Sequence, residues 1–303
     1  MADGGEGTLD AVGGTPHRTT VTGPLGGSVE AQWSLLEARA GEPGPTAVIE
    51  MARAAGRQLV PSPVGDEPLR ASTTGVGELV VAAMAAGAVR IVVAVGGSAT
   101  TDGGWGAVEV LGSPETLEGV EVVVASDVST GFLDAATIFG PQKGATQSQV
   151  DELTDRLWTL AARYRAEFGV AVDTLAGAGA AGGLAGGLAA LGARIVPGFN
   201  LVAELVDLPG RLAGADLVVT GEGHLDPPSF AGKVVGGVVS LVAGSSPVLC
   251  VVGDTDAGMV DHLPESPGDL EIVSLVARAG PERARRDTVG LIEQIVVEHL
   301  GSR

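Results

Sequence analysis

The chain has 303 residues, of which 45% are hydrophobic and only 3% aromatic, and its formal net charge is −19. This length accommodates two domains of ordinary size, and the apolar content indicates a globular protein rather than a disordered one. The negative charge makes nucleic acid and anionic membranes poor partners, and no apolar run reaches the roughly 20 residues of a membrane-spanning helix.

Runs rich in valine and isoleucine predict six strands, and an earlier segment predicts a hairpin. Several of the runs are apolar throughout, which is typical of parallel strands covered on both faces. Residues 19–36 instead alternate around a Gly/Pro turn, which predicts an antiparallel hairpin. The six predicted strands are residues 46–51, 89–95, 120–125, 216–220, 247–252 and 270–275.

Helical patterns separate the predicted strands. The longest, Gln147–Phe168, is preceded by Thr146, which forms a capping-box pattern with Gln149. The others are residues 77–86, 104–111, 179–191, 201–205, 233–243 and 283–300. Alternating strands and helices predict the α/β class with crossover connections.

Only two lysines occur, Lys143 and Lys233, so 16 of the 18 cationic side chains are arginine. Each lysine lies in a glycine-flanked loop. Arginine replaces lysine where only surface charge is needed, but replaces it poorly where a compact charge must fit beside phosphate oxygens. We therefore expect both lysine loops to face an anionic ligand. The alternative is a general bias toward arginine with two accidental survivors.

Four loops follow predicted strands, which is where ligands bind in open α/β sheets. In the first loop, small residues allow the N–H groups of Gly96, Gly97 and Ser98 to approach a phosphate. Asp102 in the same loop either caps the next helix or has a functional role, which is to hydrogen-bond a substrate hydroxyl or to hold a cation. The second, residues 126–131, supplies Asp127 as another acid, with turn formation as its alternative role.

The third loop, residues 221–229, is acidic and contains Gly221, Glu222, Gly223 and Asp226. Its two carboxylates suit Mg²⁺, and a solvated acidic loop is the alternative. Lys233 then starts a helical pattern, where its charge opposes the helix dipole and a bound anion would offset it. The fourth loop, residues 253–256, is equally well explained as a plain turn.

These loops together resemble the type I glycerate kinase family. No single match is specific, but they run in the family's order over nearly the whole chain. The matching stretches are residues 3–8, 73–79, 95–104, 139–145, 177–184, 197–198, 214–223 and 232–233.

The resemblance implies ATP-dependent phosphorylation of D-glycerate, with the 2-hydroxyl favoured over the 3-hydroxyl. It implies a flavodoxin-like doubly wound domain, residues 1–16 plus 208–303, with a second mixed α/β domain, residues 17–207, inserted in it and the active site between them. A homodimer is one possible oligomeric state. The single cysteine, Cys250, cannot form an internal disulfide, which fits a reducing compartment.

On this basis we assign roles to the candidate residues. Glu222 and Asp226 hold Mg²⁺, and the catalytic candidates are Asp102, Asp127 and Lys233. Substrate and phosphate binding falls to Arg70, Gly96, Gly97, Ser98, Lys143, Gly221 and Gly223.

The chain also departs from the family. The family's opening strand and helix, with a lysine-bearing loop, have no counterpart before Asp3, and His224 stands where the family usually has arginine. These departures leave a catalytically impaired or regulatory relative as an alternative function. A metal-dependent hydrolase is a further alternative, disfavoured by two basic loops and the absence of a histidine pair.

Overall fold

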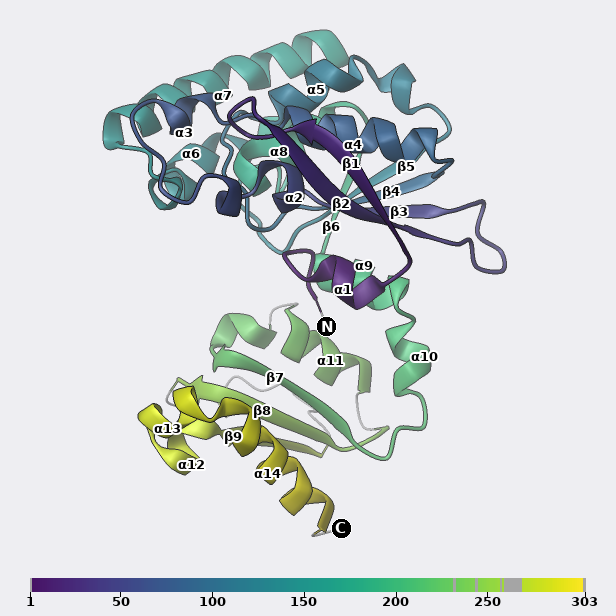
Figure 1. Ribbon diagram of the computed structural model, residues 1–303, viewed down its shortest axis with the longest axis vertical. Helices are drawn as coiled ribbons and strands as arrows, with labels where there is room; N and C mark the ends of the chain where they lie inside the picture. Colours follow the sequence, from purple (N-terminus) through teal and green to yellow (C-terminus); the bar gives the residue numbers. More distant parts are fainter. Residues whose placement is uncertain (1, 231–232, 243–244, 257, 259–268, 302–303) are drawn as a thin grey trace. The chain divides into compact units, whose positions relative to one another are not determined.

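The computed structural model describes residues 2–230, 233–242, 245–256, 258 and 269–301. The chain divides into two compact units, Met1–Val202 and Ala203–Arg303, each with its own sheet (Figure 1). Among the described residues, no helix combines the length and the apolar character that crossing a membrane requires.

The first unit is built on a six-stranded sheet whose strands follow one another in chain order. The first three strands pair antiparallel, and β3 to β6 pair parallel. The strands are β1 (Thr15–Thr22), β2 (Ser28–Leu36), β3 (Thr46–Glu50), β4 (Arg90–Ala94), β5 (Glu121–Ala125) and β6 (Arg194–Val196). The predicted α/β class and the predicted hairpin are confirmed, whereas the short β6 was not predicted.

The parallel strands are buried because their apolar runs are covered on both faces. Every residue of β3 is buried, and Ile49, Val93 and Val124 lie side by side in the register. Since side chains alternate along a strand, this pattern needs helices above and below the sheet. The predicted bounds of these strands differ from the observed ones by one or two residues.

The helices of the first unit agree with the main predicted patterns. The predicted range Gln147–Phe168 is the helix α7, the long helix of this unit in Figure 1, and its capping box is present. The others are α1 (Thr8–Val12), α2 (Ala52–Ala55), α3 (Glu67–Arg70), α4 (Thr74–Ala85), α5 (Trp105–Leu111), α6 (Ala135–Phe139) and α8 (Leu184–Ala190). The division between the units falls within α9 (Gly198–Leu205). Short 3-10 helices include Arg57–Leu59, Pro141–Lys143 and Ala180–Gly183.

The second unit contains a three-stranded parallel sheet in the order β7-β8-β9. Side chains of α12 to α14 pack on Leu249 and Val251 of β8, and α11 covers the other face (Figure 1). The elements are α10 (Leu208–Leu212), β7 (Val218–Leu225), α11 (Val234–Val242), β8 (Val248–Thr255), β9 (Leu270–Ser274), α12 (Leu275–Ala279), α13 (Pro281–Arg286) and α14 (Thr288–Gly301).

The prediction of a loop at residues 221–225 was wrong, because β7 continues through them. Glu222 pairs with Val252, and the strand ends at Leu225 opposite Thr255. The strands approach closely here, since a Cβ atom on Gly221 would lie 2.0 Å from the carbonyl oxygen of Val251. Gly221 is therefore explained by strand packing, and Glu222 and Asp226 do not share one turn. The predicted turn at 253–255 is likewise part of β8.

Residues 4–9 pack against other parts of the first unit, to which they belong. A Cβ atom on Gly4 would lie 2.9 Å from Cβ of Ala125, and the Leu9 amide donates to Oε1 of Glu50 at 2.9 Å. The division at 202/203 therefore differs from the predicted grouping of residues 1–16 with 208–303. As an assignment of the family's domains, that grouping stays a prediction.

Candidate active site

A cavity of about 410 Å³ lies in the first unit at the carboxyl ends of β4 and β5. This is the edge of a parallel sheet at which α/β proteins bind their ligands. The cavity brings together six stretches that are separated in the sequence. Its lining includes Asp3–Gly5, Arg57, Val95–Ser98, Ala125–Val128, Phe139, Gln142, Lys143, Ala180 and Ala181.

The glycine loop offers two unpartnered amides to this cavity. The Gly96 amide donates to the carbonyl oxygen of Gly4 at 3.4 Å, so it is occupied. The amides of Gly97 and Ser98 have no acceptor among the described residues, and Gly97 has a left-handed φ of 72°. Successive free amides at such a turn form an anion-binding concavity. Of the three N–H groups predicted to approach a phosphate, two therefore lack a hydrogen-bond acceptor in the described part of the chain.

Lys143 lies in the cavity wall and is only 6% exposed. Its Nζ donates to the carbonyl oxygen of Thr100 at 2.5 Å and lies 5.9 Å from the centre of the Phe139 ring. The pKa of Lys143 is lowered to about 7, chiefly by burial, while attraction to Asp102 opposes the shift and repulsion from Arg57 adds to it. A bound anion would favour the charged ammonium form.

The acceptor of Lys143 is held in place by a crowded backbone contact. Ala181, in the cavity wall, has a left-handed φ of 53°, which is strained for a residue with a side chain. The next residue must be glycine, since a Cβ atom on Gly182 would lie 2.0 Å from the Thr100 carbonyl oxygen. The 180–183 segment therefore fixes the position of the carbonyl to which Lys143 donates.

Asp127 lines the same cavity and holds the start of a helix. Its Oδ1 accepts from the amide of Gly198 at 2.9 Å, at the N-terminus of α9. Gly96, Gly97, Ser98, Asp127 and Lys143 are the five predicted site residues that this cavity brings together.

Asp102 lies outside this cavity, where it joins two helices. Its carboxylate accepts from the amide and the hydroxyl of Thr73 at 2.8 Å each, and from the amides of Gly104 and Gly106 at 3.1 and 3.2 Å. These groups lie at the starts of α4 and α5. Burial raises the pKa of Asp102, while these hydrogen bonds lower it. The geometry agrees with the structural alternative, an anchor of helix N-termini.

Arg70 and Asp102 line a second cavity of about 600 Å³. Arg70 is exposed and pairs with Asp66, with Nε 3.6 Å from Oδ1. The cationic side chain beside Lys143 is instead Arg57, which the sequence reasoning missed. No motif surrounds Arg57, so its position is apparent only from the fold.

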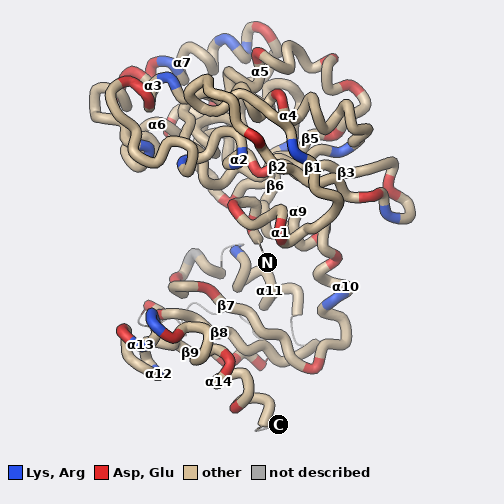
Figure 2. Tube along the Cα trace, in the orientation of Figure 1, with Lys and Arg blue, Asp and Glu red and all other residues tan. Residues whose placement is uncertain are grey.

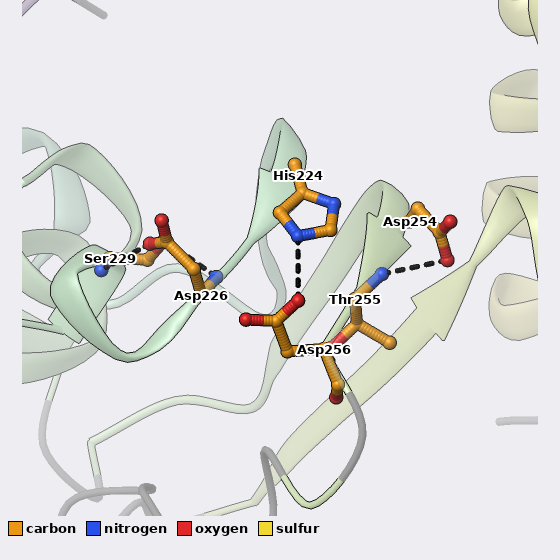
Figure 3. Close-up of polar contacts among 6 residues, drawn as sticks. All are labelled: His224, Asp226, Ser229, Asp254, Thr255 and Asp256. Atoms are coloured by element: carbon orange, nitrogen blue, oxygen red, sulfur yellow. Dashed lines mark hydrogen bonds and ion pairs between the residues drawn. The ribbon is translucent and has the colours of Figure 1, made fainter.

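The second unit carries acidic side chains along the ends of β7 and β8 (Figure 3). Oε1 of Glu222 is buried and has no hydrogen-bond partner among the described residues. Oδ1 of Asp226 accepts from the Ser229 amide at 3.0 Å and from its hydroxyl at 2.7 Å, and this hydroxyl chiefly lowers the pKa of Asp226. Nε2 of His224 lies 3.0 Å from Oδ1 of Asp256.

These contacts test whether a magnesium ion fits. An unpartnered buried carboxylate oxygen is what a hard cation would satisfy, so Glu222 fits the role, whereas the oxygens of Asp226 are partly used by Ser229. Within the described ranges, no three His, Cys, Asp or Glu side chains gather as a ready-made metal cluster. Lys233 is half-buried and lies near enough to Asp226 to lower the pKa of that carboxyl group. In the described part of the chain, no acidic side chain lies within ion-pair distance of Lys233.

Positive charge is scarce enough for these positions to stand out. Asp and Glu are spread over both units, with Lys and Arg fewer among them (Figure 2). Free amides, a buried lysine and a neighbouring arginine at the carboxyl edge of a parallel sheet form an arrangement suited to a small anionic ligand.

Comparison with known proteins identifies the family. The model of the glycerate kinase family matches residues 1–115 and 113–298. The chain is 37% identical to glycerate 2-kinase of Escherichia coli K12, over 86% of this chain and 77% of that protein. It is 38% identical to glycerate kinase of Bacillus subtilis 168, over 84% of this chain and 74% of that protein.

A solved structure gives the same result. A Salmonella typhimurium LT2 protein assigned as glycerate kinase 2 superimposes with a TM-score of 0.74 at 31% identity, covering 99% of this chain and 88% of the other. The chain belongs to the glycerate kinase family, as the resemblance of its loops predicted. It is therefore a kinase enzyme, and the named relatives are glycerate kinases.

Proposed function

We propose that the chain transfers the γ-phosphoryl group of ATP to the 2-hydroxyl of D-glycerate, giving 2-phosphoglycerate and ADP. The similarity to a protein named glycerate 2-kinase supports the choice of hydroxyl. The observation that carries the proposal is the cavity of the first unit, where free amides, a lysine and Asp127 line one space. A small hydroxy acid needs this combination of anion-binding and hydroxyl-binding groups.

The proposed roles follow from the contacts. The amides of Gly97 and Ser98 and the ammonium group of Lys143 bind anionic oxygens, because all three are hydrogen-bond donors and none of them contacts a carboxylate within hydrogen-bond or ion-pair distance among the described residues. Asp127 orients the attacking hydroxyl and accepts its proton as the oxygen bonds to phosphorus. Asp102 acts as a positioning residue that holds the starts of α4 and α5 beside the glycine loop.

The second unit is proposed to hold the nucleotide. Glu222, and less directly Asp226, would bind Mg²⁺, which when bound neutralises charge on the triphosphate. Lys233 would bind phosphate oxygens, and Gly221 and Gly223 leave the strand free of bulky side chains there. The comparisons give no support to the alternative of a catalytically impaired or regulatory relative. A cytoplasmic location and a homodimer stay proposals.

The test is an endpoint assay of the purified chain with D-glycerate, ATP and Mg²⁺. Enolase converts 2-phosphoglycerate, but not 3-phosphoglycerate, to phosphoenolpyruvate, so it is added with and without phosphoglycerate mutase. Phosphoenolpyruvate without the mutase supports the proposal, whereas a strict requirement for the mutase assigns the 3-hydroxyl. Asp127→Asn should lower kcat about 100-fold or more if Asp127 accepts the proton. Unchanged turnover in that variant contradicts its role.

A further inference from the structure

We infer that Arg57 binds the carboxylate of the substrate and so selects a hydroxy acid over a neutral polyol. The inference rests on the proposed function, because it names what one side chain of that cavity recognises. Neither the sequence motifs nor the family comparison points to this residue.

The backbone of Arg57 is attached to the glycine loop on both sides. Gly56 and Ser98 form an antiparallel bridge, in which the Arg57 amide donates to the Gly97 carbonyl and the Ala99 amide to the Ala55 carbonyl, each at 2.9 Å. The arginine thus starts its 3-10 helix at a fixed offset from the amides that face the cavity. A side chain mounted this way can present its guanidinium with little loss of backbone freedom on binding.

The charges around Arg57 leave room for an anion. Arg57 and Lys143 line both the 410 Å³ cavity and a third, smaller cavity of about 20 Å³. They lie close enough for repulsion between them to affect the pKa of Lys143. Neither has an acidic partner within ion-pair distance among the described residues. Glu67, which also lines the smaller cavity, accepts from the Val64 amide instead. An anion between the two cations would remove their repulsion.

The different shapes of the two cationic groups suggest which anionic group each one binds. A guanidinium is a planar fork that binds a carboxylate through two parallel hydrogen bonds, whereas an ammonium acts as a compact charge. The free amides of Gly97 and Ser98 remain for other oxygens. Asp127 lines the same cavity, so fixing the carboxylate on Arg57 would determine which hydroxyl of glycerate lies nearest Asp127.

The test measures Arg57→Gln and Arg57→Lys against the wild-type chain. We expect Arg57→Gln to weaken D-glycerate binding and kcat/KM for D-glycerate by about 10- to 100-fold, with KM for ATP unchanged, and Arg57→Lys to recover only part of the loss. Added guanidinium ion should partly restore Arg57→Gln, which a purely structural role would not allow. Arg18→Gln, an exposed change on the hairpin with the same loss of charge, is the matched control.

The outcomes of these measurements separate the role of Arg57 from the proposed function. D-glycerate binding is measured by calorimetry, separately from the turnover assay. A wild-type chain that binds D-glycerate without phosphorylating it contradicts the proposed function. The effect of Arg57→Gln on D-glycerate binding then still tests the role of Arg57. Unchanged D-glycerate binding in Arg57→Gln overturns the inference. A loss of affinity for ATP alone in Arg57→Gln also overturns it. So does a loss of D-glycerate affinity in Arg70→Gln that is absent from Arg57→Gln. A wild-type chain that does not bind D-glycerate overturns both.

Discussion

Replacing Lys143 with methionine should abolish activity and yet stabilise the fold at neutral pH. Burial lowers the pKa of Lys143 from 10.5 to about 7, so the unfolded chain binds a proton more tightly than the folded one. At about 1.36 kcal/mol for each pH unit, this difference sets an upper limit of about 5 kcal/mol on the cost of the lysine below pH 7. Methionine removes the cost.

The sign of the effect changes with pH. Because the folded pKa lies below the unfolded one, the wild type gains stability as the pH rises from about 7 toward 10.5, at up to about 1.4 kcal/mol per pH unit. Methionine also leaves the buried Thr100 carbonyl without its donor, which costs about 1–3 kcal/mol. Lys143→Met should therefore be about 2–4 kcal/mol more stable than the wild type at pH 7, and no more stable at pH 10.

The measurement is urea unfolding followed by tryptophan fluorescence between pH 7 and pH 10. All three tryptophans, Trp33, Trp105 and Trp158, lie in the first unit with Lys143. Lys143→Gln is the control, because it also lacks a titrating amine but packs differently from methionine. Its stability relative to the wild type should change with pH at the same slope as that of Lys143→Met. A stability difference that stays constant between pH 7 and pH 10 would refute the reasoning.

Three further predictions follow from the contacts. Gly182→Ala should lose about 1–3 kcal/mol more stability than Gly169→Ala, because both glycines have a left-handed φ, of 67° and 73°, but only Gly182 is crowded; equal losses in urea unfolding would contradict this. Asp102→Asn should lose about 1–3 kcal/mol in the same assay, since the amide cannot accept all four hydrogen bonds; an unchanged midpoint would argue against an anchor. Glu222→Gln should raise the Mg²⁺ concentration for half-maximal activity about 10-fold or more, with a smaller effect in Asp226→Asn, and equal Mg²⁺ curves would exclude Glu222 as a ligand.

The elements that could be predicted are those whose pattern is local. The helix α7 begins and ends where its capping box and the following glycine indicate, because the cap bonds join residues three apart. The buried strands β3, β4 and β5 were found from continuous apolar runs. The end of β7 was missed, since Gly221–Leu225 has little strand propensity and is extended only through its pairing with β8.

The candidate site was predicted in its loops but less well in its side chains. The glycine loop, Asp127 and Lys143 share one cavity because parallel strands end at the same sheet edge. The partner of Asp102 is Thr73, 29 residues away, so sequence spacing could not tell an anchor from a catalytic acid. Arg57 reaches the cavity through a bridge between Gly56 and Ser98, a contact with no sequence signature.

The position of β7 has a consequence for behaviour in concentrated solution. In the part of the chain that the structure describes, β7 hydrogen-bonds to β8 alone, so its other row of backbone groups lies at the edge of the sheet. Such an edge is a template on which further copies can stack and precipitate. Here the exposed residues of the strand include Gly221, Gly223 and His224, with Val219 the large apolar one. Because glycine weakens a strand, Gly221 and Gly223 make this open edge a poorer template for further copies than an unbroken apolar strand would be.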